Sequence, residues 1–482
     1  MTHKLYRTPQ LLCVAVLFLS LCCAIFSCQK DFYSTSATDR LHFSSDTIIF
    51  DTIFTERGSI THLFKVYNRN KGTVRIDEIY INQSQRNEFF MNVNGVSGRS
   101  VKGMELAAGD SLFIFIQAKL IENVADTPRF HKDSILFRYN NRYDKIILAA
   151  WGQDAYVLKG KTLTENTTWS GRKPYVIFDS LVVDAGKTLT IEEGVNVYLH
   201  NRANIIVQGS LQTKGALNNP VVFTTDRLEE SFQLLPGQWG SIIFEEMSVN
   251  NLISYTHIKC ATNGVLLQGG QAPINLRIEN SQIYNAGSHA IFAHNAHIDC
   301  FNTVLANCNG YLAAFHGGRF AFNHTTLSNL KTFGNRNTGI AASVMVSNVN
   351  PTNETETVFE NSYFRNSIIV GSMRNEILIT PKNTGDILPI MFDNCLLRQT
   401  YTAKDTIYYK ENIFVTDLNQ PLFSNTIKTP FALDSLAQAI DKGNLEYAKP
   451  FEFDILQHSR LIDQKPDIGA YEYFEIVGEN EK

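Results

Sequence analysis

A polar residue followed closely by an aliphatic one recurs through the second half of the chain at a countable spacing. The aliphatic positions lie 25, 21, 23, 41 and 28 residues apart, at Ile258, Ile283, Val304, Leu327, Ile368 and Leu396. A strand unit that repeats at roughly this interval cannot bury its apolar side alone, so it must stack on neighbouring copies. The spacing therefore predicts a solenoid in which Ile258, Ile283, Val304 and Leu327 form one interior column, with an insertion near residues 331–360.

Three segments carry a family resemblance. LVVDAGKTLTIEEGVNVYLHNRANIIVQGSLQTKGALNNPVVFTT (181–225) resembles the opening coils of the right-handed parallel β-helix proteins of the pectate-lyase-like superfamily. PGQWGSIIFEE (236–246) is similar to a segment of bacterial surface β-helices, and LIDQKPDIGAYEYF (461–474) to their closing strand. The resemblance implies a right-handed parallel β-helix. A β-propeller would repeat at about 40 to 50 residues, which fits the observed spacing poorly.

Short runs of alternating apolar and polar residues fill the segment before the solenoid. The clearest are residues 48–54, 62–67, 74–81, 111–116 and 145–151, with turn residues between them. About seven short strands in one segment predict a β-sandwich. The stretches KVYNRNKGTVRIDEI and AAGDSLFIFIQA resemble the immunoglobulin-like modules of the abnormal-spindle and hydin type. That resemblance implies a spacer or interaction domain without chemistry.

The start of the sequence predicts a membrane anchor. A basic beginning precedes an uncharged run of sixteen residues at 11–26, which is shorter than the roughly 20 residues that span a bilayer. Ile25-Phe26-Ser27-Cys28 resembles a lipobox, which implies acylation of Cys28 after removal of a signal peptide; an uncleaved signal anchor is the alternative. Gln29-Lys30-Asp31 resembles signals that send lipoproteins to the outer surface, so we expect a surface-exposed, lipid-anchored protein of the outer membrane.

The expected organisation is all-β. It comprises a lipoprotein signal peptide at 1–28, a linker at 29–40, an immunoglobulin-like β-sandwich at 41–156, a right-handed parallel β-helix at 157–474 and a polar tail at 475–482.

Charge and cysteine content exclude some classes of function. The 43 basic and 47 acidic residues give a net charge of −4, so nothing indicates an electrostatic nucleic-acid binder. Four cysteines lie in the first 28 residues, and Cys260, Cys300, Cys308 and Cys395 are scattered without a CxxC pair. We expect Cys260, Cys300, Cys308 and Cys395 to be buried core residues. The spacing leaves open whether Cys300 and Cys308 form a disulfide.

Catalytic residue types are sparse in the most regular coils. Residues 256–330 contain only two acids, Glu279 and Asp299. A lyase of this superfamily would need clustered carboxylates for Ca²⁺ and a base, and a hydrolase would need carboxylates that flank the scissile bond. We therefore expect no cofactor and no metal site, with Ca²⁺ only if the protein is a lyase.

Histidine is the unusual residue of these coils. Six of the twelve histidines lie within 68 residues, at His257, His289, His294, His297, His316 and His324. His294, His297 and Asp299 are the candidate catalytic residues, because the spacing of the histidines suggests one shared side and a strand would place His297 and Asp299 on one face. The alternative is that these histidines are hydrogen-bonded residues at coil corners.

Aromatic residues supply the ligand-binding candidates. Trp239, Tyr311, Phe315 and His316 could contact a sugar ring, although aromatics in solenoids also stack in the core. Asn280, Asn302, Asn366 and Asn394 each precede a repeating aliphatic, which predicts a hydrogen-bonded asparagine ladder at a coil corner.

Together these patterns predict a cell-surface lipoprotein whose β-helix binds a glycan or a protein partner, without catalysis. One alternative is a polysaccharide lyase or glycoside hydrolase that acts on a lateral face of the β-helix. Another is a structural protein of the cell envelope.

Overall fold

The computed structural model describes residues 32–82, 87–122, 127–330, 342–400, 406–416, 421–424 and 431–474. The chain divides into two compact units, Met1–Gln153 and Asp154–Lys482. The expected signal peptide with Cys28, part of the linker and of the insertion near 331–360, and the polar tail lie outside the described residues. Within the described part, no helix is long and apolar enough to cross a membrane.

The first unit is a β-sandwich of two five-stranded sheets, as the alternating pattern predicts. Both sheets contribute to one core, which contains Phe50, Phe64, Ile79, Ile114 and Phe137. The pairing is antiparallel except between β2 and β10. In sheet order the strands are β1 (His42–Phe43), β3 (His62–Tyr67), β8 (Ser111–Ala118), β5 (Phe89–Val93) and β6 (Val96–Gly98), then β2 (Thr47–Phe54), β10 (Arg142–Gln153), β9 (Arg129–Tyr139), β4 (Val74–Ile81) and β7 (Ser100–Leu106).

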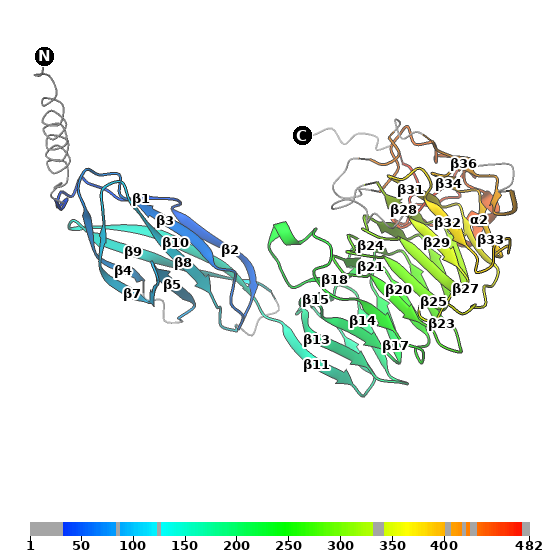
Figure 1. Cartoon of the computed structure of the whole chain (residues 1–482), viewed down its shortest axis with the longest axis horizontal. Helices are drawn as coiled ribbons and strands as arrows, with labels where there is room; N and C mark the ends of the chain where they lie inside the picture. Colours follow the sequence, from blue (N-terminus) through cyan, green and yellow to red (C-terminus); the bar gives the residue numbers. More distant parts are fainter. Residues whose placement is uncertain are drawn as a thin grey trace, which may run out of the picture. The chain divides into compact units, whose positions relative to one another are not determined.

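The second unit is a parallel β-helix, in which each strand pairs in parallel with strands one coil before and one coil after it. Figure 1 shows these strands stacked side by side from β11 onward. The pairings define three faces. β11 (Tyr156–Leu163) and β13 (Tyr175–Val183) bend from face 3 to face 1, and β25 (Ile291–Phe301) and β27 (Ala313–Asn323) bend from face 1 to face 2.

The remaining strands each belong to one face. Face 1 contains β16 (Asn204–Val207), β19 (Ile242–Phe244), β22 (Val265–Gln268), β29 (Val344–Ser347) and β32 (Ile377–Thr380). Face 2 contains β12 (Thr167–Trp169), β14 (Thr188–Glu192), β17 (Ser210–Lys214), β20 (Asn251–Ser254), β23 (Ile274–Glu279), β30 (Ser362–Arg365), β33 (Ile390–Asp393) and β35 (Tyr409–Lys410). Face 3 contains β15 (Asn196–Leu199), β18 (Val221–Thr225), β21 (Thr256–Lys259), β24 (Gln282–Tyr284), β26 (Val304–Ala306), β28 (Thr326–Asn329), β31 (Ile368–Gly371), β34 (Leu396–Leu397) and β36 (Ile413–Phe414).

The interior column of face 3 differs from the prediction by one residue. Ile258 pairs with Ile283, Ile283 with Leu305, and Leu305 with Leu327. Val304 instead pairs with Gln282 and points outward. A strand reverses the direction of its side chains at every residue, so a one-residue error in the count moves a side chain to the other surface. The predicted interior column is present, with Leu305 at the position that was predicted for Val304.

A row of left-handed residues forms the corner before face 3. The φ angles are 43° at Tyr255, 48° at Asn280, 45° at Asn302, 48° at His324, 45° at Asn366 and 52° at Asn394. Asparagine tolerates this backbone region better than most residues, which explains its recurrence. Asn302 donates a hydrogen bond to Asn280 at 3.1 Å, and the Asn366 amide lies 3.0 Å from the His324 ring. The predicted asparagine ladder is present, and His324 is one of its members.

Residues 431–473, which we call the C-terminal strap, cover the outer surface of the later coils of face 3. The strap includes α2 (Leu445–Ala448) and η3 (Lys449–Phe451). Phe431, Ile455 and Tyr471 pack on the outward-pointing Val304. Leu433 and Ile468 belong to a second cluster with outward residues of later coils. Apolar residues therefore occupy both surfaces of face 3, and this is why the outward row resembles a core row in the sequence.

Hydrogen bonds fix the strap to the corner row. The Asn444 backbone N–H donates to the Asn366 side chain at 2.8 Å, and Asn302 donates to the carbonyl of Phe453 at 2.7 Å. Gly469 has φ +114°, and a Cβ there would lie 2.8 Å from Ile368. Only glycine permits both this backbone conformation and this close approach.

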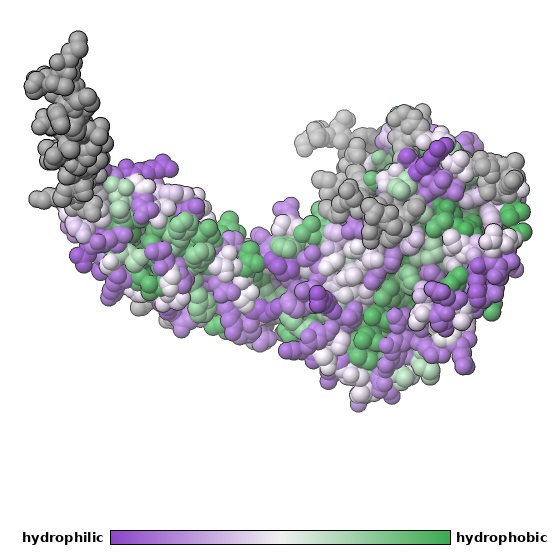
Figure 2. Space-filling model, viewed as in Figure 1, coloured by the Kyte–Doolittle hydropathy of each residue, from purple (hydrophilic) through white to green (hydrophobic). Residues whose placement is uncertain are grey.

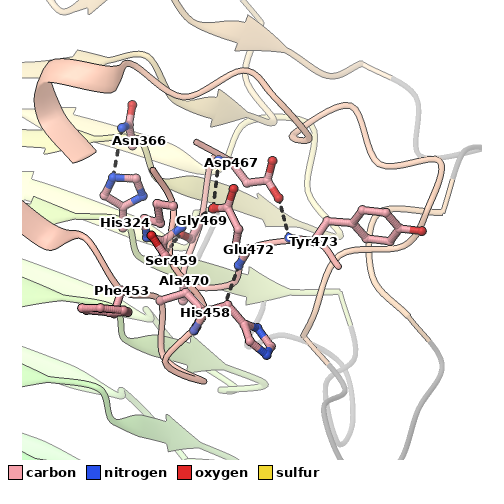
Figure 3. Close-up of polar contacts among 12 residues, drawn as sticks. His324, Asn366, Phe453, His458, Ser459, Asp467, Gly469, Ala470, Glu472 and Tyr473 are labelled. Atoms are coloured by element: carbon pink, nitrogen blue, oxygen red, sulfur yellow. Dashed lines mark hydrogen bonds and ion pairs between the residues drawn. The ribbon is translucent and has the colours of Figure 1, made fainter. Parts of the chain in front are cut away.

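The strap itself contains buried charged residues. Arg460 is fully buried and its Nη1 lies 3.1 Å from Glu472. Asp454 and Asp467 are also buried, and Figure 3 shows the Asp467 carboxylate accepting a hydrogen bond from the Tyr473 backbone. Burial raises the pKa of Asp467 to about 6 and the pKa of Glu472 to about 8. Because Arg460 supplies one positive charge, protonation of Glu472 limits the excess of buried negative charge.

This cluster predicts that the protein loses stability as the pH rises from the ordinary carboxyl pKa to about 8. Between the ordinary carboxyl pKa and about pH 8, the folded chain holds a proton on Glu472 that the unfolded chain lacks, so stability falls as the pH rises through that value. Glu472→Gln keeps the shape without the charge and should reduce this loss by on the order of 1 kcal/mol. Thermal unfolding of both proteins at a series of pH values measures this loss of stability. The exposed Glu446→Gln is the control, and equal pH slopes for all three proteins would contradict the assignment.

Candidate functional site

Face 1 carries two outward rows of contrasting chemistry. One row is apolar and consists of Ile206, Ile243, Leu266, Phe292, Ala314, Met345 and Leu378. The row beside it is polar and consists of Gln268, His294, His316, Ser347 and Thr380. Both rows follow from strand alternation, which places residues two apart on the same surface. An apolar strip next to hydrogen-bonding groups therefore runs along several coils.

Four aromatic rings lie together on this face, and we call them the ring cluster: His289, Phe292, Tyr311 and His316. The centroids of His289 and Tyr311 are 5.4 Å apart and nearly parallel, at 16°. Phe292 lies 5.4 Å from His289 and 5.1 Å from His316. All four side chains are half-buried, so each retains an exposed part. β25 and β27 hold Phe292 and His316, while His289 and Tyr311 lie on the turns that precede these strands.

A groove of about 600 Å³ opens beside the ring cluster. Its size is within the ordinary range for ligand sites. Pro351 and Thr352, from the segment after β29, form one wall. His316 lies 2.8 Å from the carbonyl of Val349 and ties this segment to face 1. The other lining residues are Asn263, Leu266, Leu267, Gln268, Gly269, Ser288, His289, Phe292 and His294.

Backbone contacts determine which ring nitrogens carry protons. The Tyr311 backbone N–H donates to Nδ1 of His289 at 3.0 Å, so that nitrogen is unprotonated and Nε2 carries the proton. Nδ1 of His316 faces a carbonyl, so it carries the proton and leaves Nε2 as an acceptor. Burial lowers the pKa of His289 to about 4 and also lowers the pKa of His316 and of His294. At neutral pH the groove therefore offers uncharged donors and acceptors.

The structure separates His294 from His297, contrary to the expectation that they share one side. Asn295, between them, has φ +44° and forms the corner where β25 passes from face 1 to face 2. His294 pairs with Gln268 on face 1, whereas His297 pairs with Asn275 on face 2. The side chains of His294 and His297 therefore extend from different faces of the β-helix and cannot act on the same bond of a substrate.

His297 and Asp299 do lie on the same face, as predicted, and each contacts an ionisable side chain. His297 lies 3.0 Å from Glu360, and Asp299 lies 2.9 Å from Arg319. In the part of the chain that the structure describes, no group of three histidine, cysteine or acidic residues could hold a metal ion. Cys260, Cys300, Cys308 and Cys395 are buried and free, so the disulfide that the sequence left open does not form.

Of the four ligand-binding candidates, two are accessible and two are not. Tyr311 and His316 belong to the ring cluster. Trp239 and Phe315 are fully buried, Trp239 donating to the Lys259 carbonyl at 2.8 Å and Phe315 stacking on Phe320 at 3.8 Å. Their rings are therefore core residues that no ligand can reach. Phe292 was not among the candidates, although its place one residue after the inward Ile291 could have suggested an outward ring.

The sandwich presents a different surface. Figure 2 shows apolar residues gathered along the visible side of this unit. On the outer surface of the sheet that contains β3, β5 and β8, Leu63, Phe90, Phe113 and Phe115 are 37% to 52% exposed. Lys65 lies over the Phe113 ring at 4.9 Å. These exposed apolar side chains offer packing area on this surface.

Comparisons with known proteins agree with the solenoid. A family model described as a pectate-lyase-like β-helix domain matches residues 161–273. No curated protein matches the chain. Among solved structures, the catalytic unit of the GH87 α-1,3-glucanase of Streptomyces thermodiastaticus is 11% identical, with 69% of this chain and 79% of that one covered and a TM-score of 0.27.

A second solved structure is a family 123 glycoside hydrolase of Clostridium perfringens, 8% identical with a TM-score of 0.18. The match covers 24% of this chain and about a quarter, 26%, of the hydrolase. Structural similarities with TM-scores this low say nothing about the activity of this chain. The family model and the parallel pairing of the strands together establish the β-helix.

Proposed function

We propose that the protein is a cell-surface lipoprotein whose β-helix binds a glycan in the groove of face 1, without catalysis. The observation that carries this proposal is the ring cluster, of which His289 and Phe292 line an open groove together with Gln268 and His294 of the polar row. Aromatic faces pack against the C–H groups of sugar rings, and amides and neutral imidazoles exchange hydrogen bonds with hydroxyl groups. None of the residues that line the groove is a carboxylate or a base with a matched acid.

The rest of the chain supports display at a surface. The lipobox-like segment ending at Cys28 supplies an acyl anchor, and multiple acyl chains on one residue hold a protein at a membrane firmly. The sandwich, an immunoglobulin-like module in this proposal, serves as the spacer between the anchor and the β-helix. Its outer apolar surface is then an area for contact with another envelope component.

Removal of the central ring tests the site. Phe292→Ala should weaken glycan binding at least about tenfold, since stacking area at the centre of the groove is lost. Binding of the purified chain to a glycan array, followed by titration of the best ligand, measures this. Phe90→Ala removes an equally aromatic, 47% exposed side chain from the sandwich and should leave affinity unchanged. If no glycan binds the unaltered protein, the proposed function is wrong.

Replacement of the lipidated residue tests the anchor. Cys28→Ser should abolish incorporation of radiolabelled palmitate and move the protein from the membrane fraction to the soluble fraction. Cys23→Ser, in the apolar run before it, is the matched control and should have no effect. Persistent membrane association of Cys28→Ser without a label would instead indicate an uncleaved signal anchor.

A second candidate function is catalysis on face 2, because that face brings His297, Arg319, Asp299 and Glu360 into neighbouring ion pairs. A lyase working there would release an unsaturated sugar from a uronate polymer. Incubation with such polymers, with and without Ca²⁺, should give no ultraviolet-absorbing product if the proposed binding function is right. A product that disappears in His297→Ala would establish the lyase instead.

A further inference from the structure

The uncharged lining of the groove bears on the class of glycan. Building on the proposed function, we infer that the groove on face 1 selects neutral glycans and discriminates against uronate-containing ones. The polar lining side chains are Asn263, Gln268, Ser288 and Thr352, together with the two lining histidines, and the remaining lining residues are apolar or glycine. Among these lining residues, no lysine or arginine is present to pair with a carboxylate.

An anion placed in this groove would lose water without gaining a counter-charge. Transfer of an unpaired carboxylate from water to a less polar site is costly, whereas a hydroxyl needs only a hydrogen-bond partner. His289 and His316 are the groups in the cluster that could have provided positive charge. The backbone N–H of Tyr311 keeps His289 uncharged, and burial holds the pKa of His316 below its ordinary value although the Val349 carbonyl favours the charged form.

His289 and His316 of the ring cluster together match a hydroxyl group, which both donates and accepts hydrogen bonds. His289 presents an N–H from Nε2, and His316 presents an unprotonated Nε2, because their Nδ1 atoms are engaged in opposite senses. Nε2 of His294, in the same polar row as His316, is buried and has no hydrogen-bond partner in the described structure. A buried polar atom of this kind is usually satisfied by water or a ligand.

A carboxylate beside the groove strengthens the discrimination. The Glu246 carboxylate accepts a hydrogen bond from the Gln271 backbone at 3.0 Å and lies against Gly270, next to the lining residue Gly269. A negative charge at this edge repels an anionic ligand and leaves a neutral one unaffected. The uncharged lining and the nearby carboxylate therefore both weaken the binding of an anionic ligand.

The experiment compares two forms of the same polymer. A uronate polymer and its carboxyl-reduced form share linkage and length and differ only in charge, and neutral α- and β-glucans and mannans extend the panel. Titration with the full mature chain should give at least about tenfold tighter binding to neutral polymers than to uronates. Preference for uronates would overturn the inference and leave glycan binding standing. Absence of binding to every polymer would overturn the proposed function as well.

A change of charge at the rim provides the second test. Gln268 is exposed, lies in the polar row and lines the groove. Gln268→Lys should raise affinity for the uronate polymer at least about threefold and make that binding sensitive to salt, while Gln268→Glu should not. Equal uronate affinity in both variants and the unaltered protein would show that the ligand does not approach this groove, and would contradict the inference.

Discussion

The register between successive coils governs the whole second unit. Each coil can bury its inward side chains only against the coils before and after it, so the alternation of every strand must stay in phase with its neighbours. The left-handed corner residues maintain this phase. They stand at a fixed distance before the inward aliphatic, so that Asn280 precedes Ile283 and Asn302 precedes Leu305 by three residues each. Every surface feature of the solenoid, including the ring cluster, depends on that phase.

The strap determines which surfaces remain for a ligand. In its later coils, face 3 is apolar on its outside as well as its inside, and the strap covers these coils. Perturbed pKa values often mark functional sites, and among the described acids the most strongly raised pKa values are those of Asp467 and Glu472 in the strap. Asp467 is buried and the Glu472 side chain is 9% exposed beside the fully buried Arg460, so both acids belong to the fold. Binding is therefore left to face 1, with its groove, and to face 2, with its ion pairs.

The sequence was sufficient for the architecture but not for the details of the site. Strand alternation and coil spacing predict the sandwich, the β-helix and the asparagine ladder. The spacing could not tell Val304 from Leu305, because an outward residue covered by the strap is as apolar as an inward one. The separation of His294 from His297 depends on one backbone angle at Asn295, which side-chain patterns do not reveal. The groove needs residues from two successive coils and a later loop, so no local motif could reveal it.

The route of the strap has a mechanical consequence for the solenoid. Coils that touch only their immediate neighbours can open one at a time from a free end. Here a single segment bonds to Asn394 through Asn444 and to Tyr255 through Gln457, positions that lie several coils apart. Fraying at the C-terminal end would have to release the strap along this entire length. The central coils that carry the groove should thus behave as one cooperative block, and a bound ligand would meet a rigid surface.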